Sequence, residues 1–500
     1  MSAIRKFAGQ TAVYGLSTVI SRFLSFILTP IYVGLYPPKV YGIFSLMYSW
    51  ASMLNALLAF GMETTYFRYL TKYANNKQKV FNNTFITVCL MAMMFLLFTL
   101  MFVDNIAAWM QRGKDYDPDY ARYIKYFIYI LVVDALSIIP FAKVRADGRP
   151  FRYSLIKFAN ILTFVGFNLL FIFVIPMLIK EKALGHEWLS SWYREGWVGY
   201  VFVSNLIASL LTLLLLIPEI LGLRLKYDLL MLKDMLLYSF PIFIANISFI
   251  INEHVDKIFL GQLLPPDISD QEVGIYAACC KIAIFLSIFI NAFRLGAEPF
   301  FFSHSKSKNA SDTYARIMNF FVIAVCLIFV LLSANIEILK YFIRGKDAAE
   351  QALYWSGLKI VPILLFGYVS LGIYINLSIW YKLSDQTRYG LYISVIGAFI
   401  TIVLNIIFIP KYSYLASAWI SLSAYTLMMI LSYLWGQRNY PIPYKLKKNV
   451  AYLLVSVCIV FVAFVVFERN LIIGNALFLI FTIAILFIER KELKLILNKK

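Results

Sequence analysis

Apolar runs recur along the whole chain, and short polar segments separate them. Each run has roughly 20–28 residues, enough to cross a bilayer core of about 30 Å. Only Pro410-Lys411-Tyr412-Ser413 separate two of these runs, so a tight hairpin is expected there. The pattern predicts an all-α polytopic membrane protein with about fourteen transmembrane helices, over 8–35, 41–62, 82–104, 120–141, 153–176, 197–220, 235–263, 274–298, 315–336, 353–378, 389–409, 414–436, 450–467 and 474–489.

Composition supports a membrane protein over a string of soluble domains. Of the 500 residues 61% are hydrophobic and 15% are charged, whereas soluble domains have about 45–50% apolar and about 25% charged residues. The first apolar run contains Arg22 and Pro30, continues to Leu35 and has no small-residue cleavage site. We therefore expect a retained first helix rather than a cleaved signal peptide.

The net charge of +19 could indicate a nucleic-acid partner, but its distribution argues against one. The basic residues cluster in the short loops, where topology and anionic lipids place them. With the N-terminus in the cytoplasm, 27 of the 46 basic residues fall on the cytoplasmic side and 13 on the other. This bias predicts an even number of helices and two cytoplasmic termini.

Two stretches of the chain have the same order of motifs, which predicts an internal duplication. The first has Tyr36-Pro37-Pro38, Tyr41-Gly42 and Gly61-Met62-Glu63, and the second has Leu264-Pro265-Pro266, Gly274-Ile275-Tyr276 and Gly296-Ala297-Glu298. The alternative is a chance similarity between two apolar hairpins. Duplication predicts two six-helix lobes, 1–234 and 235–448, related by an axis along the membrane normal. Residues 449–500 would add two helices and a basic cytoplasmic tail.

Ionisable side chains inside apolar helices are the candidates for a functional site. Inserting one into a bilayer costs roughly 2.5–3.5 kcal/mol, so such residues usually line a cavity or pathway. Lys157 and Lys359 lie near helix ends and are expected to snorkel to the interface. The candidate substrate-binding cations are Arg22, Lys257, Lys281 and Arg294. The candidate coupling or gating acids are Glu63, Asp134, Glu253, Asp256 and Glu298.

Several of these residues have a structural alternative. Glu253, Asp256 and Lys257 share one helix face, either as a Glu253–Lys257 ion pair or as part of an ion or substrate site. Arg294 and Glu298 are spaced for an ion pair of their own. Glu63 and Glu298 match between the repeats and would either form an inner gate or cap helix ends. Asp134 would be either a hydrogen-bonded core residue or a protonation site.

No motif indicates an enzyme, a metal site or a bound cofactor. The five cysteines lie within apolar runs without a CxxC pair, and the three histidines are scattered. No nucleotide-binding loop is present in the sequence. Energy for any transport would then come from a proton or sodium gradient, with Glu253, Asp256 or Asp134 as candidate coupling residues.

Two hairpins carry a resemblance to a known family. The first contains Ser21-Arg22, Thr29-Pro30, Tyr36-Pro37-Pro38 and Tyr41-Gly42. The second contains Asp256-Lys257-Ile258-Phe259-Leu260-Gly261 and Val273-Gly274-Ile275-Tyr276. Over essentially its whole length, the chain resembles the Wzx-type oligosaccharide flippases of the polysaccharide-transporter family. That family belongs to the multidrug/oligosaccharidyl-lipid/polysaccharide exporter superfamily.

The resemblance implies two lobes around a cationic central cavity, with Arg22 and Lys257 at the family's basic positions. It implies that a monomer in the bacterial inner membrane flips a polyprenyl-diphosphate-linked oligosaccharide for surface polysaccharide synthesis, such as O-antigen, capsule or exopolysaccharide. Membrane lipids and a glycan polymerase complex are the implied partners. An ion-coupled multidrug exporter of the same superfamily is the alternative. A membrane glycan polymerase or ligase fits less well, because the outer segments are short.

Overall fold

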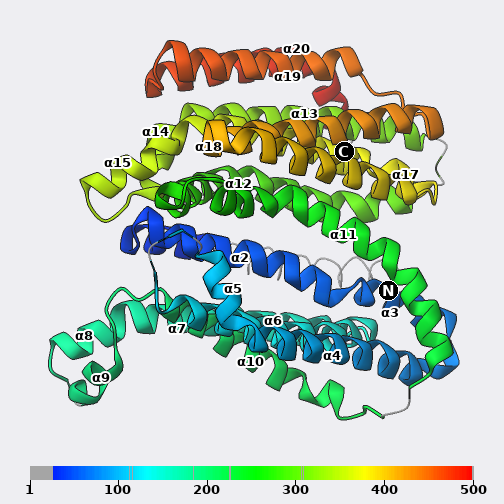
Figure 1. The fold of residues 1–500 in the computed structure, drawn as a ribbon. Helices are drawn as coiled ribbons and strands as arrows, with labels where there is room; N and C mark the ends of the chain where they lie inside the picture. Colours follow the sequence, from blue (N-terminus) through cyan, green and yellow to red (C-terminus); the bar gives the residue numbers. More distant parts are fainter. Residues whose placement is uncertain are drawn as a thin grey trace. The chain divides into compact units, whose positions relative to one another are not determined.

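The computed structural model describes residues 26–111, 113–114, 116–183, 185–224, 227–305, 307 and 309–497. The chain is 88% helical, and the described residues contain no strand, which confirms the all-α class. Figure 1 shows the elements. In chain order they are α2 (Pro38–Ala59), α3 (Met62–Lys72), η1 (Ala74–Asn76), α4 (Lys77–Met101), α5 (Val103–Met110), α6 (Tyr120–Ala146), α7 (Pro150–Leu169), η2 (Leu170–Val174), α8 (Ile175–Lys180), α9 (His186–Trp192), α10 (Gly199–Ile220), α11 (Leu229–Leu263), α12 (Pro266–His304), α13 (Ala310–Ala334), α14 (Ile336–Leu339), η3 (Lys340–Ile343), α15 (Ala348–Ser356), η4 (Gly357–Ile360), α16 (Val361–Leu377), α17 (Ile379–Leu383), α18 (Arg388–Asn439), α19 (Leu446–Phe461), η5 (Val462–Val466) and α20 (Leu471–Leu497).

Twelve helical segments of the described chain are long and apolar enough to cross a membrane. One of them, α18, is two helices joined at Ser413, whose φ of 51° and ψ of −139° are not helical. The two halves fold back on each other, because the rings of Tyr389 and Trp435 lie 5.4 Å apart. The hairpin predicted at 410–413 is therefore present. The apolar helix Phe26–Leu35 is the described part of the predicted first helix, and each of the other thirteen predicted helices has an observed counterpart.

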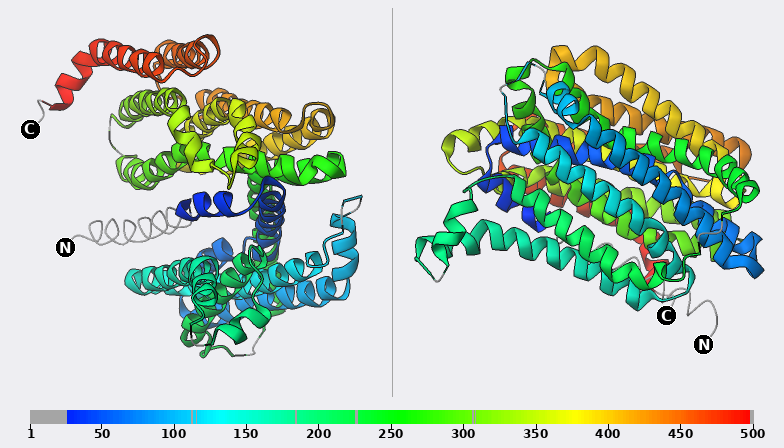
Figure 2. Two further views of the ribbon diagram at one scale, coloured as in Figure 1. Left: turned by 90° about the vertical axis from the view of Figure 1, so that its left-hand side faces the viewer. Right: turned by 60° about the horizontal axis from the view of Figure 1, so that its bottom comes forward.

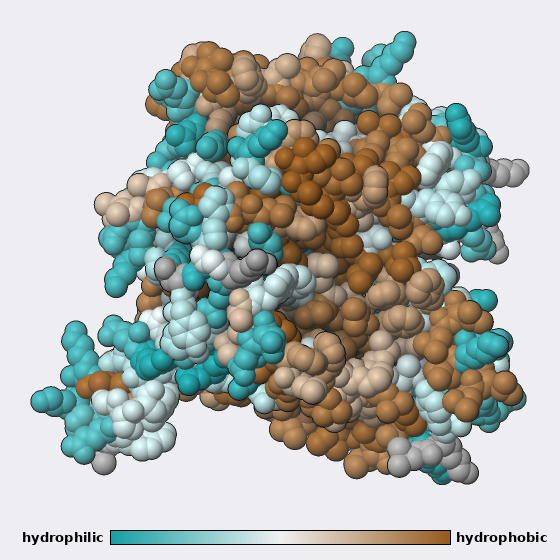
Figure 3. Space-filling model, viewed as in Figure 1, coloured by the Kyte–Doolittle hydropathy of each residue, from teal (hydrophilic) through white to brown (hydrophobic). Residues whose placement is uncertain are grey.

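Large apolar side chains on the outside of the helices are the expected surface of a chain surrounded by lipid. On α4, Leu97 is 67% exposed, Phe98 65% and Met101 78%. Figure 3 shows hydrophobic residues over the middle stretches of the helices and hydrophilic residues gathered at their ends. This distribution agrees with a multi-pass membrane protein.

The chain forms two compact units. Unit 1 contains the described residues up to Gly274 together with Thr401–Tyr414, and unit 2 contains Ile275–Ile400 together with the residues from Leu415 onward. In unit 1, α6 packs against α2, α4 and α10, while α7 packs on α10 and α11 on α2. In unit 2, α13 packs against α16, α19 and α20. The left view of Figure 2 looks roughly along many of the helices, so that those of unit 1 appear end-on. The repeat boundaries 1–234, 235–448 and 449–500 stay a prediction.

Two glycines of the repeated motif let helices α2 and α12 cross in unit 1 at very short range. A Cβ atom on Gly42 would lie 1.7 Å from the Asp270 carbonyl oxygen, and one on Gly274 would lie 1.9 Å from the Pro38 carbonyl oxygen. On α12, Asp270 precedes Gly274 by four residues, and on α2, Pro38 precedes Gly42 by four residues. Each glycine therefore faces the carbonyl group one turn before the other glycine, so the contact is reciprocal. A twofold-related pair of repeats produces a contact of this form, which supports the duplication that the sequence predicts.

Candidate functional site

Unit 1 encloses a cavity of about 650 Å³ between the helices that form its bundle. Helices α2, α3, α6, α7, α10 and α11 all contribute to its wall. Its volume falls within the range of about 300–1,000 Å³ that is typical of small-molecule sites. Most of its polar side chains are uncharged: Ser52, Asn55, Ser137, Asn160, Asn205, Ser209, Thr212 and Asn246. So many polar groups inside apolar helices indicate a water-filled or ligand-filled space, because lipid-facing polar groups are costly.

Hydrogen bonds between helices hold two of the cavity's asparagines in place. The Nδ2 group of Asn205 on α10 donates to the Tyr48 hydroxyl on α2 at 2.9 Å. The Nδ2 group of Asn160 on α7 donates to the Ala208 carbonyl at 3.1 Å and to Thr212 Oγ1 at 2.9 Å, both on α10. These bonds fix the two amides and connect α2 and α7 to α10.

Charged groups line the cavity towards the end where α3 begins and α6 ends. Helix α2 stops at Phe60 and Gly61, whose φ values of 43° and 68° are left-handed, and α3 then places Glu63 in the wall. Arg145, in the last turn of α6, forms an ion pair with Glu63. Their side chains are 41% and 43% exposed, so this pair lies at the mouth of the cavity.

Lys157 and Asp134 are the other two charged groups in the wall. Lys157 places its ammonium group 4.6 Å from the centre of the Phe141 ring, within the range of a cation–π contact. Asp134 lies on α6, three residues before Ser137, which also lines the cavity. Two bases and two acids therefore line this cavity, which is not strongly cationic over its described part.

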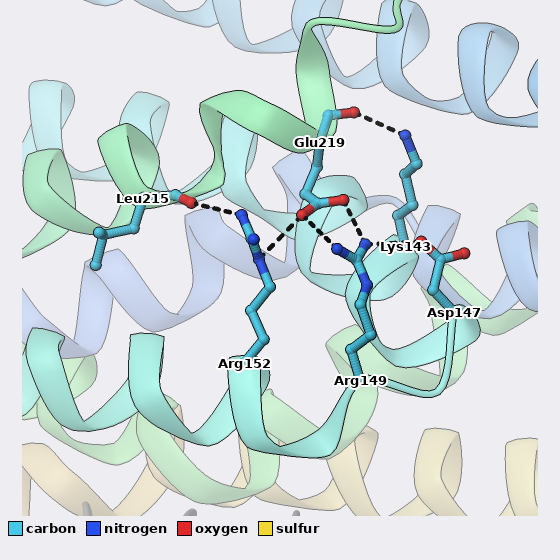
Figure 4. A network of polar contacts seen from close by, with 6 residues as sticks. All are labelled: Lys143, Asp147, Arg149, Arg152, Leu215 and Glu219. Carbon is cyan, nitrogen blue, oxygen red and sulfur yellow. Dashed lines mark hydrogen bonds and ion pairs between the residues drawn. The ribbon is translucent and has the colours of Figure 1, made fainter.

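A buried carboxylate fixes the three helices that carry most of the wall (Figure 4). Glu219 near the end of α10 is 4% exposed. It accepts hydrogen bonds from Arg149 at 3.1 and 2.5 Å and contacts Arg152 Nε at 3.1 Å. Lys143 of α6 donates to the Glu219 carbonyl oxygen at 2.9 Å. Glu219 of α10 is thus held by α6, by the turn before α7 and by α7 itself, which ties these three helices together.

A buried ion pair holds the segment between α5 and α6 to the start of α12. Lys114 Nζ lies 2.6 Å from Asp270 Oδ1, and the two side chains are only 7% and 6% exposed. Asp270 is also the residue whose carbonyl oxygen faces Gly42. This end of unit 1 is therefore tightly packed, in contrast to the exposed Glu63–Arg145 pair at the other end.

The predicted site residues fall in several places. Glu63 and Asp134 line the cavity of unit 1. On α11, Asp256 is buried and its Oδ1 lies 3.3 Å from Lys257 Nζ, whereas Glu253 is exposed. The ion pair on this helix therefore joins Lys257 to Asp256, the residue directly before it.

The other predicted site residues lie outside this cavity or outside the described chain. Lys281 lies half-buried on α12. Arg294 and Glu298 line a smaller pocket of unit 2. Arg22 lies outside the described residues.

The two glutamates that match between the repeats form matching ion pairs. Glu63 pairs with Arg145 in unit 1, and Glu298 pairs with Lys382 in unit 2. Each acid belongs to the same Gly-x-Glu motif, and each base lies near the end of the second membrane-spanning segment after it. The equivalence of Glu63 and Glu298 thus includes their partners, although Glu298 pairs with Lys382 and not with Arg294.

Sequence reasoning missed several residues of this site. Lys157 was expected to snorkel to the interface, yet it lies in the cavity wall. Arg145, which also lines the cavity, was not singled out. The asparagines were not considered at all. A search for amide side chains within apolar helices would have found Asn160 and Asn205. No cluster of metal-ligating acids, histidines and cysteines occurs among the residues described here.

Comparisons with known proteins identify relatives over most of the chain. The family profile described as "Polysaccharide biosynthesis protein" matches residues 7–303, and the MatE profile matches residues 241–407. No protein with curated annotation matches the chain.

Solved structures of transporters share the fold. The lipid II flippase MurJ in an inward closed conformation superposes with a TM-score of 0.69 at 16% identity, covering 96% of this chain and 99% of MurJ. An inward-facing multidrug resistance MATE transporter of the MOP superfamily gives 0.62 at 13% identity, covering 88% and 98%. A MOP superfamily transporter from Pyrococcus furiosus gives 0.54 at 13% identity, covering 87% and 95%.

Proposed function

The chain belongs to the polysaccharide biosynthesis protein family, and from this premise we propose that it flips a polyprenyl-diphosphate-linked oligosaccharide across the bacterial inner membrane. The observation that carries the proposal is the polar cavity of unit 1, built within membrane-spanning helices and open beside cationic groups. Alternating access between two membrane sides would expose this cavity first to the cytoplasm and then to the outer face. The polymer would be an O-antigen, a capsule or an exopolysaccharide.

The charges of the cavity suit the headgroup of such a lipid. A diphosphate carries about two negative charges and cannot cross hydrocarbon without compensation. Lys157 offers a point charge, and Arg145 offers paired donors if it exchanges Glu63 for phosphate. The predicted cations Arg22, Lys257, Lys281 and Arg294 would add to this attraction along the transport path.

A reconstituted flipping assay tests the proposal. Purified protein is placed in liposomes with a lipid-linked oligosaccharide, and a membrane-impermeant glycosidase measures how much glycan is outside. We expect the protein to bring glycan from the inner to the outer leaflet, with Lys157→Met at least tenfold slower. Equal rates in protein-containing and empty liposomes, under each imposed gradient, would refute the proposed function.

The alternative is an ion-coupled exporter of small molecules. Two observations favour it: the MatE profile matches part of the chain, and acids equal bases in the described cavity. Uptake of lipophilic cations into the same liposomes, without glycan transfer, would establish this alternative.

Coupling to an ion gradient is proposed through Asp256, which is buried next to Lys257 on α11. Transport by an Asp256→Asn protein should become insensitive to imposed proton or sodium gradients. Unchanged gradient dependence in this variant would remove Asp256 from the coupling role.

Both termini are proposed to be cytoplasmic, which cysteine labelling with an impermeant reagent at the 437–445 and 468–471 loops would test.

A further inference from the structure

In unit 2, α19 and α20 pack against α13 (Figure 1), and a buried carboxylate joins the three helices. Glu489 of α20 is 1% exposed, and its Oε1 accepts hydrogen bonds from Asn319 Nδ2 of α13 at 3.2 Å and from the Tyr452 hydroxyl of α19 at 2.8 Å. Lys448 Nζ of α19 lies 2.7 Å from the same oxygen. Because lipid offers no partners to polar groups, these contacts fix how each helix is rotated about its own axis.

This rotation turns a second stripe of α19, which is mostly apolar, towards a cavity of about 160 Å³. The stripe recurs every three or four residues, as one face of a helix does, at Leu446, Asn449, Val450 and Leu453. Side chains of α13, α16 and the second half of α18 complete the wall, among them Met318, Ile373 and Ile430. The cavity therefore lies where α19 meets three other helices of unit 2.

The mouth of this cavity faces the surface that lipid surrounds. Of its lining residues, Leu446 is 45% exposed, Val450 41% and Ile430 44%. An apolar cavity of this size stays dry and binds apolar molecules, and leaving it empty forfeits packing contacts along its wall. In a membrane the apolar molecules beside α19 are lipids, so an acyl chain is the occupant that the wall fits.

One polar group interrupts the apolar wall. Asn449 is 7% exposed, and its Oδ1 has no hydrogen-bond partner within the part of the chain that the structure describes. A buried acceptor costs free energy unless some group donates to it. The occupant should therefore carry a hydrogen-bond donor close to its acyl chain.

Two cations lie next to lining residues, where α18 ends and α19 begins. Lys447 directly follows Leu446 and is exposed, and Arg438 lies in the last turn of α18. Among the described residues no carboxylate pairs with either cation, whereas the neighbouring Lys445 and Lys448 already pair with acids of α20. Basic positions of this kind between membrane helices attract anionic headgroups and disfavour an ammonium headgroup.

We propose that this cavity is a binding site for phosphatidylglycerol. Its acyl chain lies between α19 and the helices α13, α16 and α18, its phosphate lies beside Lys447, and a headgroup hydroxyl donates to Asn449 Oδ1. Phosphatidylglycerol combines a negative charge with hydroxyl donors, so it meets all three features of the site. The bound lipid stabilises the attachment of α19 to unit 2, because it fills the space between them. This site does not depend on which molecule the protein transports.

Photoaffinity labelling of the purified full-length protein in phosphatidylcholine nanodiscs tests the site. The probe is phosphatidylglycerol with a diazirine in one acyl chain, and mass spectrometry identifies the labelled residues. We expect labelling to concentrate on the lining residues of α13, α18 and α19. Unlabelled phosphatidylglycerol should compete at a concentration about tenfold lower than phosphatidylethanolamine, because the ammonium group of the latter meets the cations.

Two variants, each with a matched control, locate the headgroup and the chain. Lys447→Gln removes an exposed cation and should weaken the probe about fivefold, whereas Lys491→Gln removes an exposed cation of α20 and should not. Val450→Trp fills the cavity and should reduce its labelling at least tenfold. Val455→Trp changes a residue of the same helix that is 46% exposed and outside the wall, so labelling should be unchanged.

Several results would overturn the proposal. They are even labelling of all lipid-facing helices, equal competition by phosphatidylglycerol and phosphatidylethanolamine, and unchanged labelling in either Lys447→Gln or Val450→Trp. Displacement of the probe by undecaprenyl phosphate, at or below the concentration of phosphatidylglycerol that displaces it, would instead assign the cavity to the chain of a transported lipid. None of these results concerns glycan transfer in the flipping assay, so the proposed function is tested separately.

Discussion

The buried ion pair between Lys114 and Asp270 should contribute strongly to the stability of unit 1. Its charged atoms are 2.6 Å apart, and both side chains are less than a tenth exposed. At an effective dielectric constant of about 20, two unit charges at this distance attract by about 6 kcal/mol. Burying both ions offsets part of this attraction, but removing one partner leaves the other buried and unpaired. Such a loss costs about 3–5 kcal/mol.

The perturbation is a double-mutant cycle of Lys114→Met, Asp270→Asn and the two together. We expect each single substitution to lower the free energy of unfolding by about 3–5 kcal/mol. The double variant should lose much less than the sum, because neither charge is then left unpaired; the coupling should be about 2–3 kcal/mol. Unfolding of the purified protein in mixed micelles, titrated with sodium dodecyl sulfate, measures these energies.

An exposed pair of the same unit provides the control. Lys72 and Asp234 are 4.0 Å apart, with side chains 52% and 53% exposed. Water screens such a pair, so Lys72→Met and Asp234→Asn should each change the free energy of unfolding by less than about 1 kcal/mol. If the Lys114 and Asp270 substitutions are additive, or cost no more than this exposed pair, the reasoning from burial is wrong.

Three further predictions follow from single residues. Gly42→Ala places a Cβ atom 1.7 Å from a carbonyl oxygen and should lower the thermal unfolding temperature of the purified protein, whereas Gly34→Ala meets no atom within 4 Å and should not. Glu219→Gln removes the carboxylate that two partly exposed arginines share and should cost about 2 kcal/mol in the same SDS titration; an unchanged midpoint would contradict this. The Lys79 ammonium group holds the pKa of Asp228 below its usual range, so the stability from this acid is complete at neutral pH and is lost as the pH falls from about 4 through the lowered pKa. Stability measured between pH 6 and pH 3 should therefore have a shallower acid slope in Asp228→Asn, and identical slopes would refute the assignment.

Element positions were predictable because bilayer thickness imposes a length on each apolar run. The predicted helix 120–141 is observed as Tyr120–Ala146, and the hairpin at 410–413 is observed at Ser413. The last two predicted helices, 450–467 and 474–489, are also present and are observed as Leu446–Val466 and Leu471–Glu492. Local turn chemistry and hydrophobicity decide these features, and both can be read directly from the residues.

The candidate site was only partly predictable. Glu63 and Asp134 were singled out because charge is conspicuous in an apolar helix, and both line the cavity. Lys157 was misassigned, because distance from a helix end does not tell whether a long side chain turns to the interface or inwards. The ion pair of Lys114 joins residues 156 positions apart, and no local pattern indicates such a partner.

The sequence by itself determined that this chain is a bundle of membrane-spanning helices with a repeated motif, because hydrophobic length and glycine placement are properties of the chain. Only the tertiary structure decided which polar groups share a cavity and which way their hydrogen bonds run. A serine in an apolar helix looks the same in the sequence whether its oxygen faces lipid, protein or a ligand. Its neighbours across the bundle set that choice, and Ser137 shares its cavity with residues of α2, α7, α10 and α11.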